Sequence, residues 1–123
     1  MLNGSVAIRL LIDCVDKDDR LGPYERVLGV GGPNLPGVAP PDASRFVSAL
    51  QRRGVAIRDR PRWRLPLDDA IKGVLEGRWS FFVQGVYDTV NVQVATSPSG
   101  RLYLRTEVDQ DTPDELLFLP QCR

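Results

Sequence analysis

Residues 68–83 have the sequence DDAIKGVLEGRWSFFV, and the spacing of the apolar residues changes halfway through this stretch. The first half carries apolar residues at the spacing of one helical face, Ala70, Ile71, Val74 and Leu75. Two aspartates precede them, where negative charge suits the positive end of a helix dipole, and Gly77 follows, where helices commonly end. The aromatic-rich second half, Trp79–Val83, is typical of a strand. The stretch therefore predicts a helix followed directly by a strand.

The residues downstream extend this strand into a sheet. Thr89–Ala95 alternates apolar and polar residues, and Arg101–Val108 does the same. The turn-forming sequence Ser-Pro-Ser-Gly at residues 97–100 separates them. We therefore expect three strands in this half of the chain, the last two paired as a hairpin. Tyr103 falls on the polar side of its strand, which predicts an exposed ring that could anchor a partner.

Two further strands and a helix are predicted upstream. Val6–Cys14 and Tyr24–Val30 are rich in apolar and branched residues, and we expect them to pair antiparallel across a polar loop. A cluster of glycine and proline at residues 31–41 then interrupts the chain. Residues 42–53 carry a helical apolar stripe behind the favourable N-cap Asp42, and residues 55–63 have an extended pattern.

These elements indicate the α+β class, with a small antiparallel sheet of about five strands and two helices. The length of 123 residues fits a single domain, residues 1–123. A chain of this size buries enough surface to form a core without added cross-links.

Composition excludes several classes of protein. The 16 basic and 16 acidic side chains leave no net charge to draw the whole protein to nucleic acid or to a membrane surface. Histidine is absent, which removes imidazole bases and the commonest zinc ligand. No apolar run approaches the ~20 residues of a transmembrane helix, and the start of the chain lacks the pattern of a signal peptide. We therefore expect a cytoplasmic protein that does not bind membranes.

Cys14 and Cys122 are the two cysteines of the chain. One disulfide between them is an alternative. Thiols stay reduced in the cytoplasm, however, so we expect two free thiols.

Several short pieces of the chain follow one another in a familiar order. They are Tyr24-Glu25-Arg26-Val27, Val30-Gly31-Gly32-Pro33-Asn34, Trp63-Arg64-Leu65, Asp69-Ala70-Ile71, Glu76-Gly77, Phe81-Phe82-Val83, Val90-Asn91-Val92, Tyr103-Leu104-Arg105-Thr106, Asp109, Asp114, Leu116-Leu117 and Leu119-Pro120-Gln121-Cys122. This series resembles an uncharacterised bacterial family catalogued as domain of unknown function 3892. The resemblance implies a fold and a bacterial or phage origin, and it implies no activity. Family members usually pass from the Gly-Gly loop to the tryptophan within several residues, so residues 36–62 are expected to be an insertion.

A row of arginines ends this expected insertion. Residues 52–64 contain six arginines and one acid. The arginines, with the tryptophan among them, are our candidate residues for binding a partner or an anion: Arg52, Arg53, Arg58, Arg60, Arg62, Trp63 and Arg64. Alternate residues of an extended chain share a side, so Arg58 to Arg64 would present one cationic row. Such a row suits phosphates, an acidic protein surface, or acids of the same chain. The acids expected for such self-pairing are Glu107, Asp109 and Asp111.

Three other motifs receive structural interpretations. Gly31-Gly32 lacks the further glycine and the Lys-Ser/Thr pair of a phosphate loop, so it predicts a turn or a close approach of the backbone. The acidic run at residues 107–115 lacks the glycine and distal glutamate of a calcium loop, so it predicts a solvated turn whose aspartates cap backbone amides. Trp63 and Trp79 flank the helix predicted from residue 68, and we expect both in the core.

The sequence shows no nucleophile-base pair and no metal-ligand set, so we expect a non-enzymatic protein without a cofactor. Our hypothesis is an interaction module, of inhibitor or immunity type, that binds an acidic surface of another protein through residues 36–62 and the arginine row. The alternative is a binder of a small anion, a nucleotide or nucleic acid through the same row. Nucleic acid is the weaker candidate partner, because Trp63 is the one aromatic residue among the arginines. A homo-oligomer is also compatible with the sequence.

Overall fold

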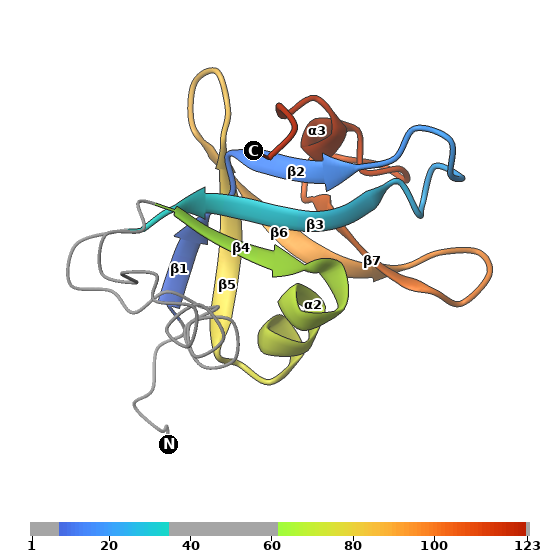
Figure 1. Ribbon diagram of the computed structural model, residues 1–123, viewed down its shortest axis with the longest axis horizontal. Coiled ribbons are helices and arrows are strands. Elements are labelled where there is room, and N and C mark those ends of the chain that lie inside the picture. Colours follow the sequence, from blue (N-terminus) through green and yellow to red (C-terminus); the bar gives the residue numbers. More distant parts are fainter. Residues whose placement is uncertain (1–7, 35–61, 123) are drawn as a thin grey trace, which may run out of the picture.

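The structure is a computed structural model that describes residues 8–34 and 62–122 (Figure 1). Within these ranges the chain forms seven strands and two helices. In chain order they are β1 (Ile8–Leu11), β2 (Cys14–Lys17), β3 (Val27–Pro33), β4 (Arg62–Pro66), α2 (Leu67–Leu75), β5 (Trp79–Gln84), β6 (Thr89–Thr96), β7 (Leu102–Thr106) and α3 (Asp114–Leu117). The helix predicted at residues 42–53 lies outside the described residues, as do residues 55–61 of the predicted extended segment.

The described strands form two small sheets. One has the order β1-β5-β6-β7 and the other the order β2-β3-β4. Neighbouring strands are antiparallel except for β1 and β5, which are parallel. The predicted α+β class is confirmed, and its strands are divided between two sheets.

The predicted strand Val6–Cys14 is wrong in its extent, because the chain changes sheet inside it. The amide of Ile12 donates to the carbonyl oxygen of Phe82 at 2.8 Å and so continues the contact of β1 with β5. The next amide, that of Asp13, donates to the carbonyl oxygen of Gly31 at 3.0 Å in the other sheet. Two residues therefore connect the sheets. The antiparallel pairing predicted with the following strand is made by β2 alone.

Cys14 and Cys122 form a disulfide, so the prediction of two free thiols is wrong. The last residues of the described chain run beside β2: the amide of Val15 donates to the carbonyl oxygen of Pro120, and the amide of Cys122 donates to that of Val15, both at 3.0 Å. This arrangement brings the Cα atoms of the two cysteines to 4.9 Å, although 108 residues separate them in sequence. A contact across that separation leaves no trace in a local sequence pattern.

Gly31 and Gly32 lie inside strand β3, where a break in the chain was predicted. A Cβ on Gly31 would lie 2.9 and 3.0 Å from the two disulfide sulfurs. A Cβ on Gly32 would lie 1.9 Å from the carbonyl oxygen of Leu11. Neither glycine has a positive φ. Of the two interpretations given to this pair, the structure supports the close approach of the backbone.

The elements predicted from residue 68 onward are confirmed. Helix α2 is followed by Gly77, whose φ of 74° is the left-handed conformation that ends many helices. Strands β5, β6 and β7 occupy the three segments in which strands were predicted, and β6 pairs with β7 across the predicted turn. None of the described helices is long and apolar enough to cross a membrane.

One hydrophobic core includes buried residues from every described strand and from both described helices. Trp63 of β4 stacks on Phe81 of β5, with ring centroids 5.8 Å apart, and Trp79 lies 6.4 Å from the same ring. The two tryptophans are 1% and 7% exposed, as expected of core residues. The aromatic contacts join the two sheets, because Trp63 belongs to one and Phe81 to the other.

Candidate functional site

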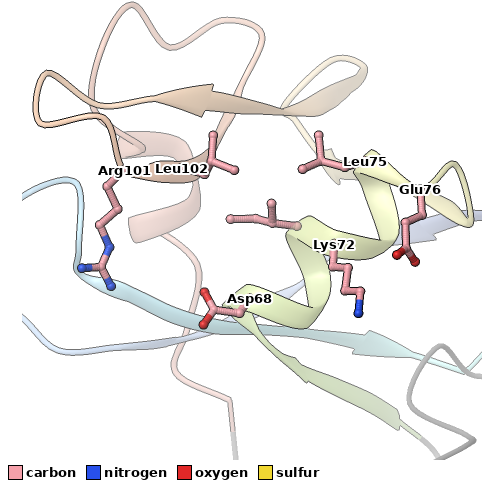
Figure 2. Close-up of a pocket in the computed structure, with 7 residues that line it drawn as sticks. Asp68, Lys72, Leu75, Glu76, Arg101 and Leu102 are labelled. Carbon is pink, nitrogen blue, oxygen red and sulfur yellow. The ribbon is translucent and has the colours of Figure 1, made fainter.

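A groove with a volume of about 640 Å³ opens between α2 and the start of β7 (Figure 2). We call it the α2–β7 groove. Its lining residues are Asp68, Ile71, Lys72, Leu75, Glu76, Arg101 and Leu102. Figure 2 shows Leu75 and Leu102 on opposite walls with their side chains turned toward the space between them.

The two leucines are the exposed apolar part of this groove. Leu75 is 62% exposed and Leu102 is 40% exposed. Leu75 belongs to the apolar stripe of α2, whose earlier members Ala70 and Ile71 are buried. The stripe that holds the helix on the core therefore ends in the groove, where apolar surface stays in contact with water.

Charged side chains surround the leucines. Glu76 pairs with Arg78 at 2.9 Å, whereas Arg101 lies 3.8 Å from its nearest carboxylate, that of Glu25. Lys72 takes part in none of the ion pairs among the described residues. The groove thus combines an apolar centre with two cationic side chains, Lys72 and Arg101, and two acidic ones, Asp68 and Glu76.

The arginine row is only partly covered by the described residues. Those outside are Arg52, Arg53, Arg58 and Arg60. Arg62 and Arg64 lie on β4 and pair with Asp13, just before β2, and with Asp16 within it. The Nε of Arg64 donates to Asp16 Oδ2 at 2.7 Å. Acids of the same chain therefore bind these two arginines, but they are not the acids at residues 107–111 that were predicted to do so.

The Arg64–Asp16 pair reaches across β3 at Gly29 and Gly31, which have no side chains. Gly31 is the register partner of Cys14 on β2 and of Arg64 on β4. A Cβ on Gly29 would lie 3.1 Å from Asp16 Oδ2. The bare backbone leaves room for the guanidinium of Arg64 to reach Asp16, and this hydrogen bond raises the pKa of Arg64 above its usual value.

Trp63 does not share this surface with the arginines. Side chains alternate along β4, so Arg62 and Arg64 are exposed while Trp63 and Leu65 are buried. The Trp63 ring packs on Phe81 and is not available to stack on a ligand at the arginine surface.

Tyr103 is 3% exposed, so the prediction of a surface anchor is wrong. Its hydroxyl donates to the carbonyl oxygen of Asp111 at 2.5 Å, and Tyr24 packs edge-on against its ring, with centroids 5.1 Å apart. The hydroxyl of Tyr24 donates to Asp111 Oδ2 at 2.7 Å, and this bond raises the pKa of Tyr24 to about 12. Asp111, which follows β7, and Tyr24, which precedes β3, thus cover the side of the strand that the alternation predicted to be exposed.

The acidic run otherwise behaves as predicted. Asp109 Oδ2 accepts hydrogen bonds from the amide of Thr106 at 3.0 Å and from its hydroxyl at 3.1 Å. Asp109 Oδ1 accepts one from the amide of Glu115 at 3.3 Å. These bonds cap the turn between β7 and α3. No group of three or more histidine, cysteine or acidic residues within the described ranges could hold a metal ion.

Sequence reasoning missed the tip of the β5–β6 hairpin. Val86 and Tyr87 at this tip are 90% and 98% exposed. We call this pair the apolar finger. The signal was present in the sequence, because hairpin turns favour glycine and short polar residues, whereas here two apolar residues lie between Gly85 and Asp88.

Residues 42–120 match the family described as "Protein of unknown function (DUF3892)". The chain belongs to this family. No curated protein and no solved structure matches the chain. The match confirms the resemblance seen in the sequence, although the pieces at residues 24–34 precede the matched range. Most of residues 36–62 fall inside that range, so the insertion remains a prediction, as does the bacterial origin.

The DUF3892 match includes two exposed apolar features of the described residues, the α2–β7 groove and the apolar finger. The lining of the α2–β7 groove and the apolar finger lie within residues 42–120. Asp13 and Asp16, which bind the described arginines, lie before that range. The groove is therefore built from family residues alone, whereas the arginine pairs need residues that precede the match.

Proposed function

We propose that this DUF3892 protein is a non-enzymatic interaction module that binds an acidic, partly apolar segment of another protein in the α2–β7 groove. The observation that supports this most is the pair Leu75 and Leu102, which lie exposed on opposite walls of the groove (Figure 2). Full burial of a leucine side chain is worth about 1.5–3 kcal/mol. A partner that covers both leucines removes their apolar surface from water, and this burial favours binding.

The charges around the leucines favour a partner with carboxylates. The carboxylate of Glu76 is engaged by Arg78, and Asp68 lies in the first turn of α2, where the helix dipole offsets its charge. Lys72 and Arg101 remain as the groups that a bound segment would meet. Carboxylates on that segment would form charge-assisted hydrogen bonds with them.

The described end of the arginine row, Arg62 and Arg64, supports a nucleic-acid partner less well. These two arginines already pair with Asp13 and Asp16, which offsets the positive charge that phosphates would need. An inhibitor- or immunity-type role belongs to the same proposal, because such proteins act by covering a partner and need no catalytic group.

The test introduces a charge at two exposed apolar positions, one inside the groove and one outside it. Tagged wild type, Leu75→Glu and Phe118→Glu are expressed in the native host, and co-purified proteins are quantified by mass spectrometry. Phe118 is 84% exposed and follows α3, which lies above β3 in Figure 1 while α2 lies below it. We expect at least one protein whose recovery falls about tenfold with Leu75→Glu, which corresponds to about 1.4 kcal/mol. Its recovery with Phe118→Glu should equal that with wild type.

Equal recovery of every co-purified protein by wild type and Leu75→Glu would contradict the proposal. Both variants should keep the wild-type melting temperature, since both side chains are largely exposed. Lys72→Glu tests the acidic character of the partner. It should lower recovery at low salt more than at high salt, because salt screens exposed charges.

A further inference from the structure

Hydrogen bonds close the turn that carries the apolar finger. The amide of Gly85 donates to the carbonyl oxygen of Asp88 at 2.8 Å, and Asp88 Oδ1 accepts from the amide of Thr89 at 2.8 Å. The flanking strands are paired up to Gln84 and Thr89, so the tip stands on a regular ladder. The backbone on both sides of Val86 and Tyr87 is thus tied to the hairpin.

Two adjacent apolar side chains, 90% and 98% exposed, form an apolar patch at this tip, and exposed apolar patches mark interaction sites. Tyrosine supplies a large apolar ring with a polar end, and it is enriched among the residues that anchor protein interfaces. The apolar finger is therefore suited to insert into an apolar recess on a partner.

The α2–β7 groove is such a recess, and it lies at the opposite end of the molecule from the apolar finger. Figure 1 shows the β5–β6 loop at the top of the molecule and α2 at the bottom. Strand β5 leads from the end of α2 toward the finger, and its six residues span about 20 Å. The finger of one molecule therefore cannot enter its own α2–β7 groove, whereas it can enter that of a second molecule.

We propose that a second copy of this chain occupies the α2–β7 groove, by inserting the apolar finger between Leu75 and Leu102. This inference rests on the groove of the proposed function and adds a second copy of this chain to the partners that the groove binds. Asp88, next to Tyr87 in the finger, supplies the carboxylate that Lys72 and Arg101 favour. The groove volume of about 640 Å³ is within the range of sites that hold several side chains or a small ligand.

The two surfaces of this contact are different, so the contact is heterologous. Each copy then offers one finger and one groove, and association continues into chains or closes into a ring. A contact made by two apolar side chains and one carboxylate is small, and small interfaces are weak. Association should therefore rise with concentration.

Two complementary substitutions test the proposal in sedimentation velocity. Tyr87→Ser removes the aromatic ring of the finger and keeps the groove, while Leu75→Glu blocks the groove and keeps the finger. The weight-average sedimentation coefficient of wild type should rise with concentration, and that of each variant alone should stay at the monomer value. An equimolar mixture of the two variants should form a dimer and nothing larger, because it contains one intact finger and one intact groove per pair. Phe118→Ser is the matched control and should associate as wild type does.

A wild type that stays monomeric at every concentration would overturn the inference, and so would variants that associate as wild type does or a mixture that forms no dimer. Lys72→Glu changes an exposed charge of the groove and should block association as Leu75→Glu does. It keeps the test valid if Leu75→Glu does not fold. The two proposals can fail separately. If wild type stays monomeric but Leu75→Glu still loses a co-purified protein, the self-association fails and the proposed function stands. If the mixture forms a dimer but Leu75→Glu loses no co-purified protein, the self-association stands and the proposed function fails.

Discussion

Gly73 determines how closely α2 approaches β5. A Cβ on Gly73 would lie 2.0 Å from two carbons of the Trp79 ring. That ring is 7% exposed, and its Nε1–H donates to the carbonyl oxygen of Ala70 at 3.1 Å, so it is fixed both by packing and by a hydrogen bond. The helix therefore rests directly on the tryptophan because residue 73 has no side chain.

We expect Gly73→Ala to lower the free energy of unfolding by about 1–3 kcal/mol, the usual effect of extra atoms in a packed core. A loss of stability would identify the close contact with Trp79, because alanine at an open helix position is about 1 kcal/mol more favourable than glycine and would raise stability. Urea denaturation followed by circular dichroism measures the change. In Gly22→Ala the new Cβ would meet nothing within 4 Å. This control should change stability by less than about 0.5 kcal/mol, and a Gly73→Ala protein as stable as the control would contradict the packing argument.

Single residues were predictable where a local pattern decides their environment. Trp63 and Trp79 were placed in the core from their positions beside a helix, and both are buried. The alternation along β7 correctly puts Tyr103 on the side of the strand opposite to Leu104. It cannot show that Asp111 and Tyr24 then cover that side, because the covering residues come from other segments. Burial by a distant segment has no local signature.

At the scale of elements, the disulfide joins β2 to the last residues of the described chain. Backbone hydrogen bonds of Val15 and the bond from Gln121 Nε2 to Asp16 Oδ1, 2.8 Å, hold the same segment. Lys17 Nζ donates to the carbonyl oxygens of Leu117 and Leu119 at 2.8 and 3.0 Å. The native contacts of β2 with this segment do not depend on the disulfide alone, so the reduced protein should still fold.

We expect reduction of the disulfide to lower the free energy of unfolding by about 2–5 kcal/mol, because the bond closes a long loop and restricts the unfolded chain. Urea denaturation with and without a reductant measures the loss. The double variant Cys14→Ser/Cys122→Ser should be less stable than the oxidised protein and should not respond to reductant. Identical urea midpoints for oxidised and reduced wild type would show that the cross-link adds nothing to the folded state.

Elements were predictable where their partners are close in sequence. Helix α2, strand β5 and the β6–β7 hairpin follow from residues 68–108, in which each element packs on a near neighbour. The division of the first predicted strand between two sheets was not predictable. It depends on Phe82 and Gly31 accepting hydrogen bonds from successive amides, and these partners lie far apart in the chain. For the same reason the acids that bind Arg62 and Arg64 were misassigned, since self-pairing could be expected but its geometry could not.

For the whole molecule, the central question is whether the two sheets unfold together. The arrangement of Trp63 and Trp79 around Phe81 puts the contact between the sheets at the centre of one core. Trp63 reports on the three-stranded sheet and Trp79 on the four-stranded sheet. Removal of one tryptophan therefore leaves a fluorescent probe in one sheet.

We expect Trp63→Phe and Trp79→Phe each to unfold in a single transition, with fluorescence and far-ultraviolet circular dichroism giving the same urea midpoint within each variant. Both variants should be less stable than wild type, because a smaller ring leaves a cavity beside Phe81. The comparison of probes is therefore made within a variant, where that loss affects both signals equally. If fluorescence of one variant changed at a lower urea concentration than its circular dichroism, one sheet would open before the other. That result would show that the shared aromatic core does not make the two sheets unfold together.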